Sequence, residues 1–556
     1  MILPFSNVGS VQNAANVVVL FLKHECKISK IYFINKTYFL FLSNIFIISY
    51  LKMLKKSIIR LLFIFTVLLF SNISAQCAAN FEFTPLAKRA YNRVISLRFA
   101  EAIPMLVDLR INEPDNLIVY YIEDYMDILK IVMHEDKAEF KKLEPNKAKR
   151  LTALERGKNC GSPYYRLCVA EINLHWALAR GKFGEYGQYI TAIREVNNAY
   201  QLLTDNQKKY PDFIANKKTL GILHALIGTI PSELRWGAKL LSMNGSIAQG
   251  RQEIEEVVDY ANAHPGFVFE EETLVMYSFA LLYLGNQAED AWTVIKKGKL
   301  DAAKNPLAAI ALANVAMRTG RNDEAIQYLE SRPQSSAYMY FALPEYMLGV
   351  TKLYKQDASA KAHFQTFINK FPGKNYVKNC YQKLAWHYLI NGDEKGYWDN
   401  MALCKSKGTD VIDEDKSALR EAKTGLKPDV TLLKARLRFD GGYYQQAYQL
   451  LKDKNIKDYG DKRFELEHTY RLGRITQKMG NSTEALQHFQ TTINTGRDEP
   501  YYYACNAALQ MGTIYEEQKN TQQAINYYNL CIEISPEEYS MSLHQKAKTG
   551  LNRLGK

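Results

Sequence analysis

The carboxy-terminal half of the chain repeats one spacing of residue types, and this spacing limits the possible folds more than any other feature. A small residue is followed by an aromatic residue three positions on, a turn residue seven on, alanine twelve on, a bulky residue sixteen on and proline twenty-four on. Self-similarity of this kind indicates a stack of short structural units rather than one large core. The last copy is complete, with Gly512, Tyr515, Lys519, Ala524, Tyr528 and Pro536 in the six places.

The residue types in this spacing suit a pair of antiparallel helices. Gly473 and Ala485 are expected where the two helices cross closely, because a larger side chain there would push them apart. Phe489 then fills the space beside the crossing, and Gly480 permits the turn between the helices. Proline at the last position closes the second helix. The pattern therefore predicts an all-α fold built from helical hairpins.

Weaker copies continue toward the amino terminus, as a solenoid requires because each unit buries a face of its neighbour. Two half copies end near Pro114 and Pro211. We predict a repeat array over residues 301–556 and a less regular helical region with degenerate repeats over 76–300. The interval between the copies that open at Ala385 and Ala435 is longer than the intervals between the other copies of the array. The small residues that open the incomplete copies of the array are Ala313, Gly349, Ala385, Ala435 and Gly473.

These motifs resemble the tetratricopeptide repeat (TPR). The resemblance implies a right-handed superhelical solenoid whose concave groove is lined by the first helix of each hairpin and receives a protein or peptide partner. On this reading Tyr502, Asn506 and Arg474 face the groove and bind the partner. Tyrosine is abundant near helix starts, and the alternative is that these tyrosines fill the spaces between helices. The sequence leaves both readings open.

The segment from Thr219 to Val257 is similar to the tetratricopeptide repeat protein 39 family and its fungal inclusion-body-clearance relatives. An apolar helix ending in Ile230-Pro231 is followed by a short Leu-rich helix and a Gly250-Arg251 start to the next helix. The family has a Gly-Asp-Arg element where this chain has Gln249-Gly250-Arg251. The resemblance implies a helical scaffold without a transferable active site. We expect Gly221 to Arg251 to be buried between the two halves of the chain.

The amino terminus carries an export pattern. Lys55, Lys56 and Arg60 precede an apolar run and then small residues, so residues 53–75 are predicted to be a secretory signal peptide starting at Met53. Residues 1–52 are then a mis-annotated extension. The rival is a membrane anchor over 32–51, and membrane contact is expected only if this segment is retained. Lipidation of Cys77 is disfavoured because Gln76 stands where a small residue is required. The predicted location is the periplasm or cell envelope.

No motif for chemistry is found in the sequence. A nucleophile elbow, a phosphate loop and a His-Glu-x-x-His pair are all missing, and His134-Glu135 has no second histidine four residues on. Asp413-Glu414-Asp415 is expected to be a solvated turn rather than a calcium loop. More than half of the net charge of +13 lies in residues 1–75, which argues against nucleic acid as a partner. We expect no enzyme activity, no cofactor and no metal.

Export makes disulfide bonds possible, because thiols oxidise outside the cytoplasm. Cys505 and Cys531 open and close the last hairpin, and Cys380 and Cys404 occupy nearly the same places in an earlier one. Each pair could staple its hairpin if the Cα atoms approach within roughly 7 Å. The alternative is that these cysteines fill helix crossings as small apolar residues. Cys160 with Cys168 is a third, less certain pair, which leaves Cys77 unpaired.

Together these features predict an exported, non-catalytic scaffold that mediates protein–protein interaction. The alternative is a SusD-like glycan-binding protein of the cell envelope, since such receptors are also exported and built on these repeats. Against it, those receptors are lipoproteins with long insertions between repeats, whereas Cys77 lacks a proper lipidation motif. An enzymatic reading would place chemistry in the region 115–300, where no motif supports it.

Overall fold

The computed structural model describes residues 78–555 except 184–185, 231–234 and 286. Within these ranges the chain forms helices and no strand, and one isolated bridge pairs Asn80 with Asn116. The predicted all-α class is confirmed. The predicted signal peptide, the extension before it and Cys77 lie outside the described residues. Across the ranges described, no helix combines the length and apolar composition of a membrane span.

Helices of the amino-terminal half already pack as hairpins. The pairs are α3 with α4, α8 with α9, α10 with α12, and α13 with α14. Thr84 caps the first of these helices by accepting a hydrogen bond from the amide of Ala87, and Pro85 follows at the first helical position. The helices are α3 (Pro85–Ile95), α4 (Phe99–Asn112), α5 (Ile118–His134), α6 (Lys137–Leu143), α7 (Pro145–Leu154), the 3-10 turn η1 (Glu155–Gly157), α8 (Pro163–Phe183), α9 (Tyr186–Lys209), α10 (Ala215–Gly228), α11 (Arg235–Leu240), α12 (Ile247–Ala263), α13 (Glu270–Tyr283) and α14 (Ala288–Lys297).

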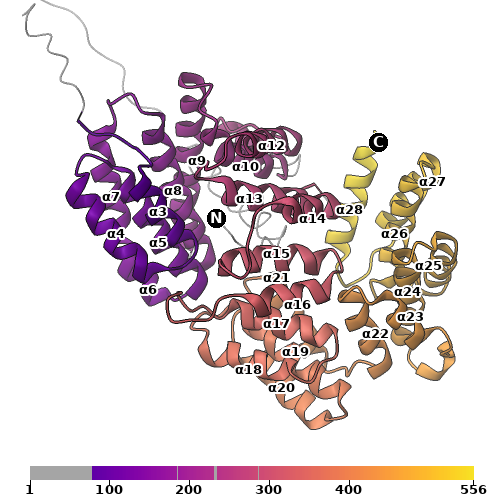
Figure 1. Ribbon diagram of the computed structural model, residues 1–556. Coiled ribbons are helices and arrows are strands. Elements are labelled where there is room, and N and C mark those ends of the chain that lie inside the picture. The colour runs from indigo at the N-terminus through magenta and orange to yellow at the C-terminus, as the bar shows by residue number, and fades with distance from the viewer. Residues whose placement is uncertain (1–77, 184–185, 231–234, 286, 556) are drawn as a thin grey trace, which may run out of the picture.

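The carboxy-terminal half continues as hairpins of consecutive helices, interrupted once by α21 and ended by α28. In Figure 1 the helices follow an arc from indigo α3 to yellow α27, and α22, α24 and α26 lie on its inner side. The elements are α15 (Pro306–Arg318), α16 (Asn322–Ser331), α17 (Leu343–Tyr354), α18 (Ala360–Lys370), α19 (Val377–Ile390), α20 (Glu394–Ser406), α21 (Asp413–Thr424), α22 (Val430–Asp440), α23 (Tyr444–Leu451), η3 (Ile456–Tyr459), α24 (Lys462–Lys478), α25 (Ser482–Gly496), α26 (Tyr503–Glu517), α27 (Thr521–Glu533) and α28 (Ser540–Arg553).

The small residue and the bulky residue of each repeat touch, as the spacing predicts. A Cβ atom added to Gly512 would stand 2.6 Å from the ring of Tyr528, and the same contact is 2.6 Å between Gly349 and Phe364. Phe364 is fully buried. Because the glycine has no side chain, the two helix backbones approach until the ring fills the space between them.

The turn position adopts the left-handed conformation in the repeat hairpins between α15 and α27. Gly480 and Gly442 have φ of 82° and 81°, which glycine adopts without steric cost. In two hairpins a larger residue takes the same place, Gln356 at φ 56° and Lys519 at φ 61°. The turn therefore imposes the conformation, and glycine is the least strained residue for it.

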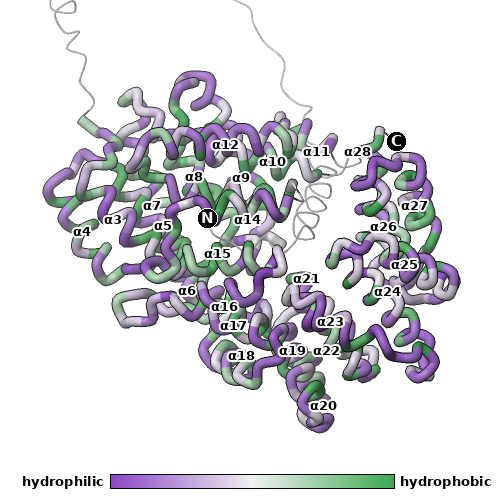
Figure 2. Tube along the Cα trace, turned by 45° about the vertical axis from the view of Figure 1, so that its right-hand side comes forward, coloured by the Kyte–Doolittle hydropathy of each residue, from purple (hydrophilic) through white to green (hydrophobic). Residues whose placement is uncertain are grey.

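Buried apolar side chains form several clusters along the arc rather than one centre. Leu466, Phe489 and Tyr528 belong to the cluster of the last repeats, and Leu432 and Ile475 to a neighbouring one. Figure 2 shows hydrophobic and hydrophilic residues mixed along the helices of the arc. This is the packing of a solenoid, in which each hairpin buries only its neighbours.

The segment from Gly221 to Arg251 is only partly buried, which corrects the expectation for it. In α10, Leu223 and Ala225 are buried, and a Cβ on Gly250 would lie 2.2 Å from the carbonyl oxygen of Gly221. In α11, by contrast, Trp236 is 43% exposed and Leu240 63%. The reason is that α10 and α12 pair directly with each other, which leaves α11 outside their hairpin.

Candidate functional site

The three residues predicted to bind a partner meet around Tyr470 on the inner side of the arc. Asn506 on α26 donates a hydrogen bond of 2.7 Å to the hydroxyl oxygen of Tyr470, and Arg474 on α24 donates one of 3.1 Å. Tyr502 packs edge-on against the ring of Tyr470, with centroids 6.0 Å apart. All three predicted residues are half-buried. Successive first helices therefore present one continuous polar and aromatic surface.

Two more arginines extend this surface. Arg471 on α24 pairs with Glu467, which it contacts through Nε at 2.7 Å. Arg436 on α22 lies over the ring of Trp386 at 4.6 Å, and its nearest carboxylate is Asp440 at 3.8 Å. We call Arg436, Tyr470, Arg471, Arg474, Tyr502 and Asn506 the inner face.

The three guanidinium groups of the inner face are not equally neutralised. Arg471 has a close carboxylate partner, and although burial opposes the effect, this ion pair holds the pKa of Glu467 below its usual value. Arg474 lies over the ring of Phe439 at 5.3 Å, and its hydrogen-bond acceptor is the neutral hydroxyl of Tyr470. The Nε of Arg474 is buried without a hydrogen-bond partner. A buried donor left unpaired carries a desolvation cost.

Two lysines near these arginines have lowered pKa values, and burial is the larger cause of both shifts. Burial and the charge of Arg436 lower the pKa of Lys383 to about 7. Burial and the charge of Arg474 lower the pKa of Lys546 on α28. Both shifts have the sign that burial alone gives an amine, and the neighbouring guanidinium groups add to them. Among the described residues, the carboxylates within 4 Å of the three inner-face guanidinium groups are Asp440 at Arg436 and Glu467 at Arg471.

The additional helix α21 lies against the inner side of α19. The carboxylate of Asp415, which is fully buried, accepts hydrogen bonds from the amides of Tyr376 (2.7 Å) and Asn379 (2.8 Å) at the start of α19. Glu421 accepts 2.7 Å hydrogen bonds from Trp386 and Gln382, one turn apart. The long interval between Ala385 and Ala435 thus forms a helix, and Asp413-Glu414-Asp415 is its first turn rather than a solvated loop.

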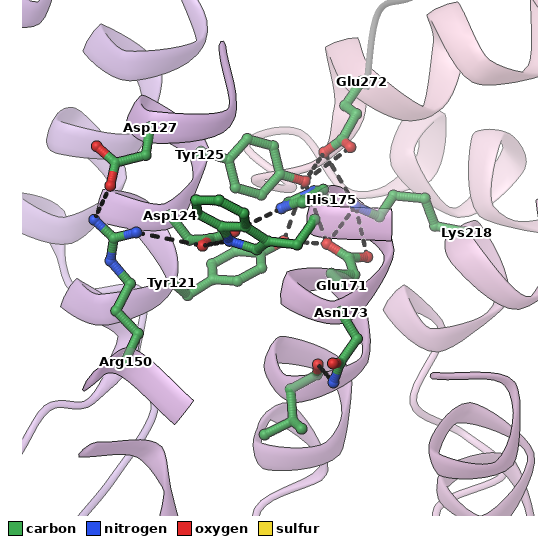
Figure 3. Close-up of polar contacts among 12 residues, drawn as sticks. Tyr121, Asp124, Tyr125, Asp127, Arg150, Glu171, Asn173, His175, Lys218 and Glu272 are labelled. Atoms are coloured by element: carbon green, nitrogen blue, oxygen red, sulfur yellow. Dashed lines mark hydrogen bonds and ion pairs between the residues drawn. The ribbon is translucent and has the colours of Figure 1, made fainter. Parts of the chain in front are cut away.

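A second polar cluster is buried in the amino-terminal half, as Figure 3 shows. Lys218 on α10 is fully buried, and its Nζ lies 3.0 Å from a carboxylate oxygen of Glu171 and 3.0 Å from one of Glu272. Tyr121 donates a 2.5 Å hydrogen bond to Glu171, and Tyr91 one of 2.8 Å to Glu272. The cluster joins α3, α5, α8, α10 and α13.

The charged groups of this cluster form ion pairs with one another. Burial by itself would lower the pKa of Lys218, but Glu171 and Glu272 together raise it. Lys218 in turn lowers the pKa of Glu272, against the effect of burial. The adjoining cavity, lined in part by Tyr125, Glu272 and Asn305, has a volume of about 30 Å³. That is room for about one water molecule. The arrangement therefore fixes the packing of five helices.

Asp124 forms a third buried group beside this cluster. It accepts a 2.9 Å hydrogen bond from the indole of Trp176 and lies 2.9 Å from Nδ1 of His175. Arg150 contacts Asp124 at 3.4 Å and Asp127 at 2.7 Å. Sequence reasoning missed both buried groups, because their members are separated by up to more than a hundred residues and follow no spacing.

One part of the chain matches a known family. Residues 465–537, which run from the first turn of α24 past the end of α27 and include most of the inner face, match the tetratricopeptide repeat. These residues are therefore similar to tetratricopeptide repeats. The TPR match and the hairpins upstream support the TPR-type solenoid predicted from the spacing. No curated protein matches the sequence.

Two solved structures align with most of the chain at low identity. The APC/C hetero-tetramer Cut9-Hcn1 is 12% identical over 83% of this chain and 95% of that one, with a TM-score of 0.21. A circular tandem repeat protein with a novel repeat topology is 11% identical over 84% and 96%, with a TM-score of 0.14. At these TM-scores neither structure adds to the argument from the TPR match.

The predicted disulfide staples are not formed in the TPR array. Cys380, Cys404, Cys505 and Cys531 are free, buried thiols. The sulfurs of Cys505 and Cys531 lie 3.6 Å apart, which is a van der Waals contact rather than the roughly 2.05 Å of a bond. Antiparallel packing brings the two ends of the hairpin together as expected, but the sulfurs fill a helix crossing, as the alternative reading held.

The third predicted pair is not formed either. Cys168 is free and fully buried within α8. Cys160 is disulfide-bonded, so its bonding partner is another cysteine. The difference has a physical reason, because Cys168 points into the core whereas Cys160 lies in the loop before α8. Over the ranges that the structure describes, no group of His, Cys, Asp and Glu side chains has the arrangement of a metal site.

Proposed function

We propose that this protein is a non-catalytic scaffold that binds a protein partner in a concave groove formed by the inner face of its TPR array. The observation that supports this most directly is the clustering of Tyr502, Asn506 and Arg474 around Tyr470. Tyrosine and arginine dominate the binding energy of protein interfaces. Their contacts with one another restrict their motion before binding, so less side-chain entropy is lost when a partner arrives.

The test replaces Tyr502, Asn506 and Arg474 together by alanine and measures capture of proteins from an envelope extract. We expect capture to be lost while the melting temperature falls by only a few degrees, because all three side chains are half-buried rather than core residues. A matched control replaces Gln490 and Tyr527, which hydrogen-bond at 2.9 Å across the second helices α25 and α27. The control should still capture the partner.

Two results would contradict this proposal. A collapse of the melting temperature in the triple variant would assign the three residues to folding. Retained protein capture together with specific binding in a parallel glycan screen would favour the SusD-like alternative.

Export to the periplasm or cell envelope is part of the proposal. It is supported by the basic residues and the apolar run of residues 53–75, which have the order of a secretory signal peptide. Sequencing the amino terminus of the mature protein tests this. A mature chain that begins at Met1 would contradict it.

We also propose kinship with the tetratricopeptide repeat protein 39 family. It is supported by the close crossing of α10 and α12, where Gly221 and Gly250 face each other and where Gly228 and Gly245 meet opposing backbone. Any side chain at Gly250 would collide with the carbonyl of Gly221, so the glycines of this segment have a physical role. An alignment of relatives in which these glycines vary freely would contradict the kinship.

A further inference from the structure

Helix α11 exposes two large apolar side chains outside the hairpins. Trp236 is 43% exposed and Leu240 is 63% exposed. They are four residues apart, so they lie on one face of the helix. Gly237 and Ala238 are buried on the opposite face, where their small size lets α11 lie close to the rest of the protein. Large apolar side chains that are exposed together mark a surface for interaction.

The segment that follows α11 is tied to the neighbouring hairpins. The hydroxyl of Tyr200 on α9 donates a 2.9 Å hydrogen bond to the carbonyl of Asn244 and accepts one of 3.1 Å from its amide. A Cβ atom at Gly245 would stand 2.6 Å from the backbone of His224 on α10. These contacts fix where α11 ends, so its exposed side chains belong to a positioned surface.

Two basic side chains border this apolar pair. Arg235 and Lys239 are exposed and four residues apart, one position before each apolar residue along the helix. Neither has a carboxylate partner among the described residues. The sequence from Ala215 to Gln252 contains five lysines and arginines and one acidic residue, Glu233. The exposed face of α11 is therefore apolar along one side and positively charged along the other.

This combination suits the surface of a lipid bilayer. The indole of tryptophan is favoured at the boundary between headgroups and acyl chains, because the ring is apolar and its N–H is a hydrogen-bond donor. A leucine on the same face adds apolar area that leaves water when the helix lies on the membrane. Basic side chains beside them are attracted to anionic headgroups. The charge of α11 is thus complementary to that of an anionic bilayer.

We propose that α11 docks the protein onto the surface of a bilayer that contains anionic lipids. Trp236 and Leu240 enter the headgroup boundary, and Arg235 and Lys239 pair with lipid phosphates. Two apolar side chains and two charges give weak, reversible binding, and α11, with six residues, lies on the membrane rather than crossing it. None of these residues belongs to the inner face, so the proposal is independent of the proposed function.

This route to a membrane differs from the one expected from the sequence, in which contact required residues 32–51. A second copy of the chain is a poorer occupant of α11. A stable interface buries about 800 Å² on each partner, which is more than one face of so short a helix offers. A two-fold axis through α11 would also bring Arg235 and Lys239 close to the same residues of the other copy, and like charges repel across an interface.

The test measures cosedimentation of the protein with large unilamellar vesicles. Vesicles of phosphatidylcholine with phosphatidylglycerol provide the anionic surface, and vesicles of phosphatidylcholine alone are the uncharged control. We expect Trp236→Ser with Leu240→Ser to weaken binding to the anionic vesicles about tenfold or more, because both side chains lose their burial in the bilayer. Arg235→Gln with Lys239→Gln should weaken it about tenfold, and high salt should have a similar effect.

Trp398 on α20 supplies the matched control. It is similarly exposed, at 39%, but is not paired with a second apolar side chain on its helix. Trp398→Ser should therefore leave vesicle binding unchanged. All variants keep the same amino terminus, so any binding through residues 1–75 is equal in each and does not produce a difference between them.

A local readout comes from an environment-sensitive fluorophore attached to Leu240→Cys. Its emission should shift to shorter wavelength on anionic vesicles, whereas the same fluorophore on Gln365→Cys, an exposed position of α18, should not respond. Equal vesicle binding by the natural chain and the Trp236→Ser/Leu240→Ser variant, or no emission shift at residue 240, would overturn the proposal. So would a dimer that this variant abolishes, because α11 would then bind a second copy, or a large fall in its melting temperature, because the pair would then serve folding.

Discussion

Gly473 lies against the ring of Phe489, so closely that a Cβ atom at residue 473 would stand 2.6 Å from ring carbons. The two residues lie on α24 and α25, which form one hairpin. Because Phe489 is fully buried, its ring has no free space into which it can move. This single contact sets how closely the two helices of the hairpin approach.

Replacing Gly473 by alanine should lower the free energy of unfolding by about 1–3 kcal/mol, the usual cost of overpacking a core. The gain in helix propensity, about 1 kcal/mol, offsets only part of this cost. Gly181 provides the control, because a Cβ there meets nothing within 4 Å in α8. Gly181→Ala should be neutral or stabilising in the same urea titration, and a stabilised Gly473→Ala variant would contradict the packing argument.

Lys519→Gly should stabilise the last hairpin by about 0.5–1 kcal/mol. Lys519 has φ of 61°, a conformation that costs a residue with a side chain roughly 1–2 kcal/mol, and glycine regains most of this despite its greater entropy in the unfolded chain. The neighbouring Gln518 has φ of −76°, so Gln518→Gly should destabilise instead. Thermal melts of the two variants check the prediction, and equal shifts would refute it.

Removing the charge of Lys218 should be severely destabilising. Lys218→Met leaves Glu171 and Glu272 buried without their cation, which typically costs about 3–5 kcal/mol. A second change, Glu272→Gln, should recover part of the loss because it removes one unpaired charge. Lys208, which is exposed near the end of α9, is the control, and Lys208→Met should stay within about 0.5 kcal/mol.

The same cluster predicts a direction of acid sensitivity. Lys218 holds the pKa of Glu272 well below that of an unfolded chain. A carboxyl whose folded pKa is lowered contributes stability above its unfolded pKa, and this contribution is lost as pH falls through the folded value. The natural chain should therefore lose more stability than the Lys218→Met/Glu272→Gln variant between about pH 5 and pH 2. Parallel urea midpoints for the two chains would refute this.

The lowered pKa of Lys383 predicts how stability changes at alkaline pH. Its folded pKa of about 7 lies below the ordinary 10.5, because burial and Arg436 disfavour the charged amine. Between these two values the unfolded chain binds more protons than the folded one, so stability contributed at this site rises with pH. The melting temperature of the natural chain should rise more steeply from pH 7 to pH 10 than that of Lys383→Met. Identical slopes would contradict the shifted pKa.

Much of the carboxy-terminal fold follows from the spacing alone. Gly512 and Tyr528 contact each other within one hairpin, and Gly480 forms the turn of another. In both cases the residues that make the contact are close together in the sequence, so the spacing can predict them. The same locality let the spacing predict that Tyr502, Asn506 and Arg474 lie on neighbouring first helices, where the structure brings them together around Tyr470. The cysteine pairs show the limit of this reasoning, since Cys505 and Cys531 are adjacent as expected but unbonded.

The sequence by itself determined the helical hairpins, their closest crossings and the surface on which first helices lie, because these depend on residues within one repeat. Only the tertiary structure decided that α21 covers the inner side of α19, that Tyr539 contacts Arg420, and that Lys218 pairs with Glu171 and Glu272. Such contacts depend on the curvature that small rotations between successive hairpins accumulate along the array. The spacing of residues in the sequence does not predict this curvature, because each rotation depends on the packing of many side chains at once.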